Sequence, residues 1–216
     1  RPDVKTRLGI DYESLKAINP GIVYGSISGF GQDGPYVQRP GVDQIAQGLG
    51  GLMSITGLPG QGPVRVGIPV ADLTSGLYCA IGILVALLER EVTGQGQWVQ
   101  ASLLQAQISM LDFQAARWLM KGEVPGQAGN NHPTSIPTGV FPTSDGHINI
   151  AAAGDKIFER FCEAMGEPGL AAAVGNFQGL QHRRLGGFRH IGIVGVPPGQ
   201  AHQVHIVRFG LGRFVG

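Results

Sequence analysis

The pattern of apolar and polar positions predicts alternating helices and strands over the first 120 residues. Helical spacing covers residues 12–18, 43–49, 73–93 and 103–120, and short apolar runs typical of buried strands cover 22–27, 64–70 and 98–101. In the longest helix, apolar residues recur at intervals of three or four from Leu77 to Leu88, and Gly94 provides the C-terminal stop. This order predicts an α/β fold.

The residues after 120 predict a linker followed by a smaller domain. The stretch 121–139, KGEVPGQAGNNHPTSIPTG, is rich in Gly, Pro and Asn, which is typical of a linker. After it, HINIAAAG predicts a strand, and DKIFERFCEAMG predicts a helix with Asp155 as N-cap and Gly166 as C-cap. We therefore expect a core domain over residues 1–120 and the start of a small second domain over 140–168.

The composition agrees with this fold and narrows the classes of function. Glycine accounts for 36 of the 216 residues, more than double the usual share of ~7%, as expected for many tight turns. The net charge of +1 gives no reason to expect a nucleic-acid partner. Cys79 and Cys162 lie in apolar helical patterns rather than at metal or disulfide spacings, so we expect two buried thiols and no metal site.

The sequence predicts a cytoplasmic protein without a membrane partner. The opening stretch RPDVKTRLGIDYESLK lacks the apolar core of a signal peptide. The longest apolar run, Leu77 to Leu88, is too short to cross a bilayer and is expected to be a buried helix.

The composition changes abruptly after Pro168. Residues 1–168 contain 11 Lys and Arg and 15 Asp and Glu, whereas residues 169–216 contain five Arg, four of the six His and no Lys, Asp or Glu. One interpretation is a basic interaction tail. The other is a segment translated in a shifted reading frame, which the weak periodicity and the lack of helix caps favour. The scattered histidines share no helix face and predict no metal site.

The turn after the first predicted strand has the spacing G-x-G-x-x-G, over Gly29–Gly34. A dinucleotide site with this motif needs a helix that begins at the last glycine, so that its N-terminus faces the pyrophosphate. Here Pro35 and Pro40 follow, and no helical pattern begins before Val42. Asp33 would also place a carboxylate inside the phosphate cradle. The residues therefore argue against a nicotinamide or flavin site.

Asp72 lies between the apolar stretch VGIPVA and the long apolar helix. An aspartate directly before a helix is a typical N-cap, whose side chain accepts hydrogen bonds from the first N–H groups. The junction of a strand's carboxyl end with a helix N-terminus is also where α/β proteins hold catalytic groups, and a carboxylate there can act as a nucleophile. The spacing alone leaves both roles open.

Four stretches, taken in order, carry a resemblance to a known family. They are LKAINPGIVYGSISGFGQDGPY, GVDQIAQGLGGLMSITG, VGIPVADLTSGLYCAIGILVALLEREVTGQGQWVQASLLQA and GDKIFERFCEAMGEP. They resemble the class III CoA-transferase family, over residues 1–167; that family includes formyl-CoA:oxalate CoA-transferase, carnitine CoA-transferase and α-methylacyl-CoA racemase. The resemblance implies a Rossmann-like α/β domain, a small α+β second domain and an interlocked homodimer. It also implies that the glycine turn leads into a wall lined with CoA.

The resemblance implies transfer of CoA from an acyl-CoA thioester to a carboxylic acid. Asp72, in VADLTSG, matches the family's catalytic aspartate, which forms a mixed anhydride and then an aspartyl-CoA thioester. CoA is thus expected as part of a substrate and not as a permanently bound cofactor. The residues that match the family's CoA contacts are Arg1, Arg7, Arg39, Pro40, Gly41, Val42 and Asp43.

Two alternatives are an α-methylacyl-CoA-type racemase and an inactive remnant that only binds CoA. Racemases of this fold carry a histidine at the position of Val42, and valine cannot transfer a proton, so this residue favours CoA transfer. His132, in the linker, is expected to be a loop residue rather than a second base. The family's N-terminal part and C-terminal return segment have no counterpart here, so we expect a fragment, for which the inactive alternative stays open.

Overall fold

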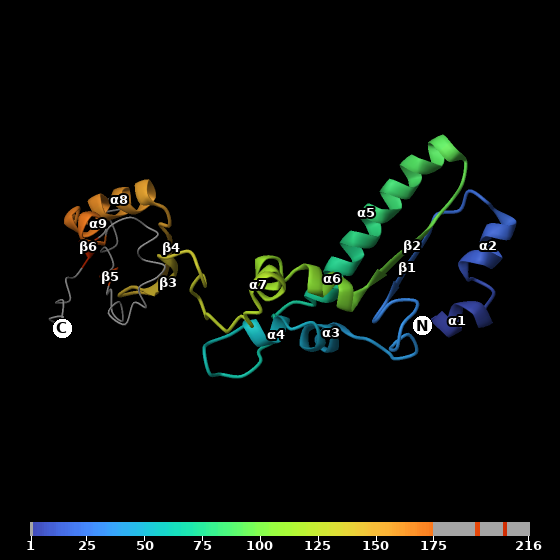
Figure 1. The fold of residues 1–216 in the computed structure, drawn as a ribbon, viewed down its shortest axis with the longest axis horizontal. Coiled ribbons are helices and arrows are strands. Elements are labelled where there is room, and N and C mark those ends of the chain that lie inside the picture. The colour runs from blue at the N-terminus through green and yellow to red at the C-terminus, as the bar shows by residue number, and fades with distance from the viewer. Residues whose placement is uncertain (1, 175–192, 195–204, 207–216) are drawn as a thin grey trace. The chain divides into compact units, whose positions relative to one another are not determined.

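The computed structural model describes residues 2–174, 193–194 and 205–206. The chain divides into two compact units, Arg1–Gly129 and Asn130–Gly216 (Figure 1). The first unit combines helices with a parallel pair of strands, whereas the strands of the second unit pair antiparallel. The division between the units falls inside the stretch 121–139.

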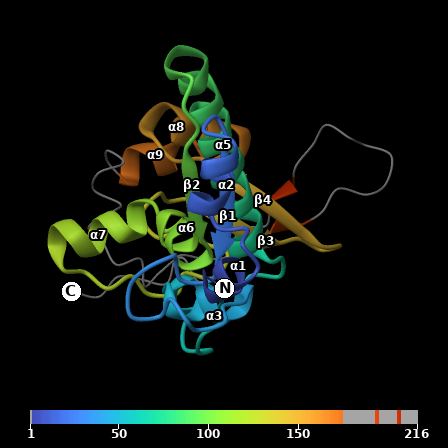
Figure 2. The same cartoon turned by 90° about the vertical axis from the view of Figure 1, so that its right-hand side faces the viewer.

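The first unit is built around one long helix that lies along two parallel strands (Figure 1, Figure 2). β1 pairs with β2, from Tyr24 opposite Trp98 to Ser28 opposite Ser102. The long helix α5 packs against both strands and against α3 and α6. The mixed α/β class is as predicted, while the larger sheet of a Rossmann-like domain stays a prediction. The elements are α1 (Pro2–Arg7), α2 (Tyr12–Ile18), β1 (Tyr24–Ser28), α3 (Asp43–Leu49), α4 (Leu52–Ile55), α5 (Val70–Thr93), β2 (Trp98–Ser102), α6 (Leu103–Ser109) and α7 (Phe113–Lys121).

Glycines allow α5 to approach the strands closely. A Cβ atom on Gly25 of β1 would lie 2.8 Å from Cδ1 of Ile83, and a Cβ atom on Gly82 of α5 would lie 2.6 Å from Cγ1 of Val99 in β2. A methyl group at either glycine would therefore press on a side chain of the facing element. The lack of a Cβ atom at these two positions thus lets the long helix lie close to both strands.

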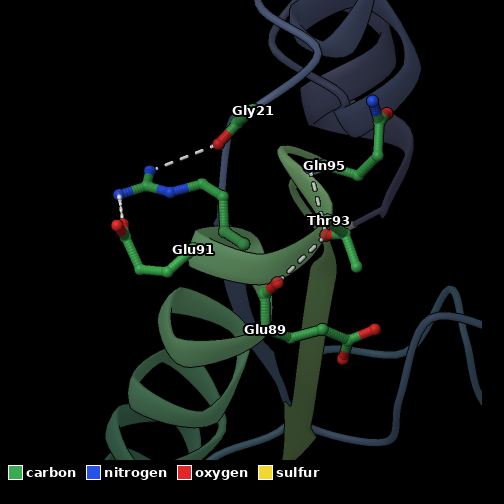
Figure 3. Close-up of polar contacts among 6 residues, drawn as sticks. Gly21, Glu89, Glu91, Thr93 and Gln95 are labelled. Carbon is green, nitrogen blue, oxygen red and sulfur yellow. Dashed lines mark hydrogen bonds and ion pairs between the residues drawn. The ribbon is translucent and has the colours of Figure 1, made fainter.

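The C-terminal end of α5 is closed by hydrogen bonds that reach the turn before β1 (Figure 3). Gly94 has φ of 71° and its N–H donates to the carbonyl of Arg90 at 2.8 Å, which confirms the predicted stop. The Thr93 hydroxyl accepts the N–H of Gln95 at 3.2 Å. The Arg90 guanidinium donates to the carbonyl of Gly21 at 3.3 Å, so the helix end is joined to the chain that enters β1.

α5 is longer and more apolar than the sequence analysis assumed. Within the described residues it is the one helix whose length and composition suffice to cross a membrane, so the exclusion based on the run Leu77–Leu88 was wrong. One face packs on the strands and on α3 and α6, while the opposite face exposes apolar side chains. A single such helix is weak evidence for a span, because the core helix of a folded domain has the same composition. The large exposed side chains of α5 are Leu73, Leu77, Tyr78, Ile81, Leu84, Val85, Leu88 and Val92.

Two predicted elements of the first unit were wrong. Residues 64–70 do not form a strand, because the N–H of Val66 donates to the side chain of Gln47, at 2.8 Å, rather than to a neighbouring strand. The helix predicted over residues 103–120 is broken into α6 and α7 near Asp112, whose φ is 45°. That backbone conformation lies outside the right-handed helical region.

The short helix α2 has a side-chain cap. Oδ1 of Asp11 accepts the N–H of Ser14 at 3.1 Å, and Oδ2 accepts the Ser14 hydroxyl at 2.8 Å. These hydrogen bonds hold the pKa of the Asp11 carboxyl below its ordinary value, because they favour the charged form. The helix matches the predicted boundaries.

The second unit contains two antiparallel strand pairs and two helices within its described residues. Asp155, predicted as the N-cap of α8, is instead its first residue, because Gly154 occupies the cap. Gly166, predicted as the C-cap, is instead the residue after it, because Met165 occupies the cap; its φ is 72°. β3 begins inside the predicted linker. Residues 169–174 form a helix, whereas most of the predicted tail lies outside the described residues. The elements are β3 (Thr138–Pro142), β4 (His147–Ala151), α8 (Asp155–Ala164), α9 (Gly169–Val174), β5 (Ile193–Val194) and β6 (His205–Ile206).

Candidate active site

A cavity of about 330 Å³ lies in the first unit, where β1 ends and α5 begins. Its wall includes Asp72, Arg39, Pro40 and Gly41, four of the residues that the sequence analysis assigned to the site. The end of a strand and the N-terminus of a helix meet here, which is where α/β proteins hold reacting groups. The fold therefore brings a carboxylate and an arginine to one cavity.

The glycine turn shapes this cavity by bringing two backbone segments together. A Cβ atom on Gly29 would lie 2.4 Å from Cα of Gly41, and a Cβ atom on Gly41 would lie 2.4 Å from Cα of Gly29. Gly31 and Gly34 have φ of 99° and 85°, values that favour glycine. Close backbone approach and left-handed backbone thus account for the glycines without a bound dinucleotide.

Asp72 is not the N-cap of α5. Pro69 occupies that position and makes no side-chain cap hydrogen bond, while Asp72 is the third residue of the helix. The Asp72 residue is exposed, and within the described part of the chain its carboxylate has no hydrogen-bond or ion-pair partner. Of the two roles that the spacing left open, the N-cap role is therefore excluded, and the carboxylate is free at the positive end of the helix dipole.

The N–H groups of the first turn of α5 differ in their partners. The N–H of Val70 donates to the carbonyl of Ile68 at 2.8 Å. The N–H of Ala71 donates to Oδ1 of Asp43, also at 2.8 Å. Among the described residues, the N–H of Asp72 has no acceptor. A free N–H group at a helix N-terminus is suited to stabilise a negatively charged oxygen.

The Arg39 guanidinium stacks on the ring of Tyr36. The central carbon of its guanidinium lies 4.3 Å from the ring centroid of Tyr36, and Tyr36 meets Phe30 edge-on with the ring centroids 5.4 Å apart. No carboxylate pairs with Arg39 in the part of the chain that the structure describes. A guanidinium that is stacked but not ion-paired is suited to bind a phosphate or a carboxylate through two hydrogen bonds.

Among the described residues, the others assigned to CoA binding do not line the cavity. Arg7 is exposed at the end of α1, and Val42 is exposed as the N-cap of α3. Asp43 is buried, and both of its carboxylate oxygens accept hydrogen bonds from the protein, which argues against direct contact with CoA. Arg1 lies outside the described residues.

His132 and the cysteines lie in settings that suit structural roles. In the second unit, Nδ1 of His132 accepts the N–H groups of Ser135 at 2.8 Å and Thr134 at 3.2 Å, as expected for a loop residue. Cys79 and Cys162 are free and buried, as predicted, and burial raises the pKa of the Cys162 thiol. The described residues contain no group of three or more His, Cys, Asp or Glu side chains that would hold a metal ion.

Part of the cavity wall was not predicted from the sequence. For the residues at the end of β1, a usable signal existed, since ligands in α/β proteins bind beyond the carboxyl ends of strands. Leu103 begins α6 and gave no such signal, because only tertiary packing brings it beside Asp72. The unpredicted wall residues are Ile27, Ser28, Gly29, Phe30, Val37 and Leu103.

Comparison with known protein families gives a match over most of the chain. The model of CoA-transferase family III matches residues 1–186. This match extends beyond residue 167, where the resemblance was expected to end, so that limit was wrong.

Individual relatives agree with the family match. The chain is 41% identical over 169 residues to succinate–glutarate CoA-transferase of Agrobacterium fabrum, which covers 78% of this chain and 42% of that protein. It is 39% identical over 172 residues to acetyl-CoA:oxalate CoA-transferase of Acetobacter aceti, covering 79% of this chain and 44% of the relative. The chain thus spans less than half the length of these relatives.

A solved structure supports the same assignment at the level of the fold. The crystal structure of a CAIB/BAIF family protein from Brucella suis superposes with a TM-score of 0.68 at 40% sequence identity. The superposition covers 79% of this chain and 45% of that structure.

Proposed function

Because the chain belongs to CoA-transferase family III, we propose that it transfers CoA from an acyl-CoA thioester to a carboxylic acid, with Asp72 as the nucleophile. The observation that carries this proposal is the free Asp72 carboxylate at the N-terminus of α5, in one cavity with Arg39. Since the chain spans less than half of its relatives, the proposal concerns the full-length protein.

The proposed reaction proceeds in two symmetric halves. An Asp72 oxygen attacks the thioester carbonyl, the C–S bond breaks, and a mixed anhydride and CoA thiolate form. The thiolate then attacks the Asp72 carbonyl of the anhydride, which releases the donor acid as a carboxylate and leaves an aspartyl-CoA thioester. The acceptor carboxylate reverses these steps: it forms a new anhydride with Asp72 and expels the thiolate. Attack of that thiolate on the acceptor's carbonyl gives the new acyl-CoA and returns Asp72.

Each attack places negative charge on a carbonyl oxygen. The Asp72 N–H, which has no acceptor among the described residues, lies at the positive end of a 24-residue helix and is a suitable donor for that oxygen.

Arg39 provides the charge for binding CoA in this proposal. Its stacked guanidinium pairs with a CoA phosphate, while Pro40 and Gly41 present backbone along the cavity wall. Further CoA contacts in this proposal, carried over from the family resemblance, are Arg1, Arg7 and Val42. We also propose the family's interlocked homodimer for the full-length protein.

We propose a short dicarboxylic acid as acceptor. This follows from the names of the two relatives, whose acids are succinate and glutarate in one and oxalate in the other. A dicarboxylate has a second charged group, which distinguishes it from a monocarboxylic acid of equal length.

CoA exchange provides the direct test of this function. The full-length protein is incubated with succinyl-CoA and isotopically labelled glutarate or oxalate, and with propionate as a monocarboxylate control. We expect labelled acyl-CoA from a dicarboxylate, at a rate at least about tenfold above that with propionate. Exchange of the α-proton of an α-methylacyl-CoA in deuterated water, without CoA transfer, would instead identify a racemase.

Replacing Arg39 should weaken CoA binding. We expect Arg39→Ala to raise KM for acyl-CoA by about tenfold or more, since a charge-assisted pair to phosphate is worth roughly 1.5–3 kcal/mol. Arg90→Ala is the control, because Arg90 lies eighteen residues along α5 from Asp72, about 27 Å at 1.5 Å per residue. Equal KM values for wild type and Arg39→Ala, measured by steady-state kinetics, would contradict this role.

A further inference from the structure

The N-terminus of α5 is capped by a residue of another helix. Pro69 has no side-chain acceptor, and the N–H of Ala71 donates instead to Oδ1 of Asp43, 2.8 Å away. Asp43 begins α3 and is 8% exposed, while Ala71 is fully buried. The helix that carries Asp72 is therefore held at its second residue by α3.

Gln47 extends this link to the chain that leads into α5. Its Nε2 donates to Oδ2 of Asp43 at 2.7 Å, and its Oε1 accepts the N–H of Val66 at 2.8 Å. Nε2 also lies 3.4 Å from the carbonyl oxygen of Ile68. Gln47 is fully buried, and a buried polar network with its hydrogen bonds made is rigid. One turn of α3 thus fixes both the approach to α5 and its first turn.

This link matters for Asp72 because Asp72 follows Ala71 directly. Ala71 packs with Ala46 and Leu103 in a buried cluster, so its backbone is held by packing as well as by Asp43. The cap from Asp43 also leaves the Asp72 carboxylate free of the capping role. Nucleophilic attack depends steeply on geometry, and a displacement of about 1 Å can lower a rate roughly a hundredfold.

We propose that Asp43 and Gln47 are positioning residues that hold the Asp72 carboxylate in line for attack on the thioester. This inference rests on the proposed function of Asp72. Asp43 and Gln47 do not line the cavity; they act through the backbone N–H groups of Ala71 and Val66. Their loss therefore slows the chemical step and leaves CoA binding unchanged.

The test compares matched variants of the full-length protein. Asp43→Asn keeps an acceptor for the Ala71 N–H but turns an amide nitrogen toward Nε2 of Gln47, so that two donors meet. Adding Gln47→Glu restores a donor–acceptor pair and keeps one buried charge and the acceptor for Val66. We expect kcat to fall about 10- to 100-fold in Asp43→Asn with KM for acyl-CoA within about twofold, and to recover to within about fivefold of wild type in the double variant.

A structural control separates positioning from stability. Asp11→Ala removes a side-chain cap from α2, so it should lower Tm and leave kcat unchanged. Gln47→Met is a second test. It removes the hydrogen bonds of Gln47 to Asp43 and Val66 but keeps the one from the Ala71 N–H to Asp43, and it should also lower kcat at constant KM. An unchanged kcat in both Asp43→Asn and Gln47→Met, with folding verified by circular dichroism, would overturn the proposal. A fall of kcat in Asp43→Asn that the double variant does not reverse would also overturn the proposal.

Asp72→Ala, measured in the same assay, distinguishes failure of the positioning role from failure of the proposed nucleophile. Loss of exchange in Asp72→Ala with wild-type kcat in Asp43→Asn contradicts the positioning role alone. Wild-type exchange in Asp72→Ala contradicts the nucleophile itself.

Discussion

Asp72→Ala is expected to lower the rate of CoA exchange by on the order of a thousandfold or more, because it removes the group that forms both covalent intermediates. CoA binding should stay within about tenfold, since the Asp72 carboxylate makes no ion pair within the described residues and the phosphate contacts are assigned to Arg39. The variant should also fold normally. Asp72 is exposed and is not the N-cap, so its removal leaves the cap from Asp43 in place.

Asp72→Asn refines this expectation. An amide has nearly the shape of a carboxylate but lacks its nucleophilic charge, so exchange should be lost to a similar extent with a smaller effect on stability. Isotope exchange between labelled acid and acyl-CoA measures the chemistry, and isothermal titration with CoA measures binding. Exchange at the wild-type rate in either variant would remove Asp72 from the mechanism.

Gly29→Ala is expected to destabilise the first unit strongly. The new methyl group would lie 2.4 Å from Cα and 2.7 Å from the backbone nitrogen of Gly41, atoms that cannot move aside as a side chain can. Overpacking of this kind costs about 1–3 kcal/mol and sometimes more, so we expect the free energy of unfolding to fall by about 3 kcal/mol. Any folded protein should bind CoA poorly, because Gly29 and Gly41 both line the cavity.

Gly76→Ala is the matched control for this substitution. Gly76 lies inside α5, where a Cβ atom would meet no other heavy atom within 4 Å outside the local helix backbone. Alanine favours a helix by up to about 1 kcal/mol over glycine, so this variant should be as stable as wild type or more stable. Urea unfolding of both variants checks the contrast. Equal unfolding midpoints for Gly29→Ala and wild type would contradict the close contact.

Elements with strong local signals could be predicted from the sequence. The α2 and α3 boundaries agree with the helical spacing, and Gly94 ends α5 as expected, because periodicity and a left-handed glycine are local properties. Residues 64–70 were misassigned because the N–H of Val66 donates to the side chain of Gln47, a tertiary contact that the local pattern does not show. The break at Asp112 and the short helix α4 likewise carry no local signal strong enough to predict them.

In the candidate site, too, the sequence identified individual residues but not the contacts between distant segments. Asp72 and Arg39 were assigned by resemblance, and the structure brings both to one cavity. Spacing left both an N-cap and a nucleophile role open for Asp72, whereas the cap comes from Asp43, which is distant in sequence. Such a contact depends on how α3 packs against α5, so one sequence without its fold could not show it.

The central claim is that CoA becomes covalently attached to Asp72, and mapping that attachment tests it most directly. The full-length protein is mixed with acyl-CoA in the absence of acceptor, quenched in acid, digested and analysed by mass spectrometry. We predict that the peptide containing Asp72 gains the mass of CoA less one water, that hydroxylamine removes the adduct, and that Asp72→Asn never forms it. Active exchange without any such adduct, or with CoA attached to another residue, would contradict the account.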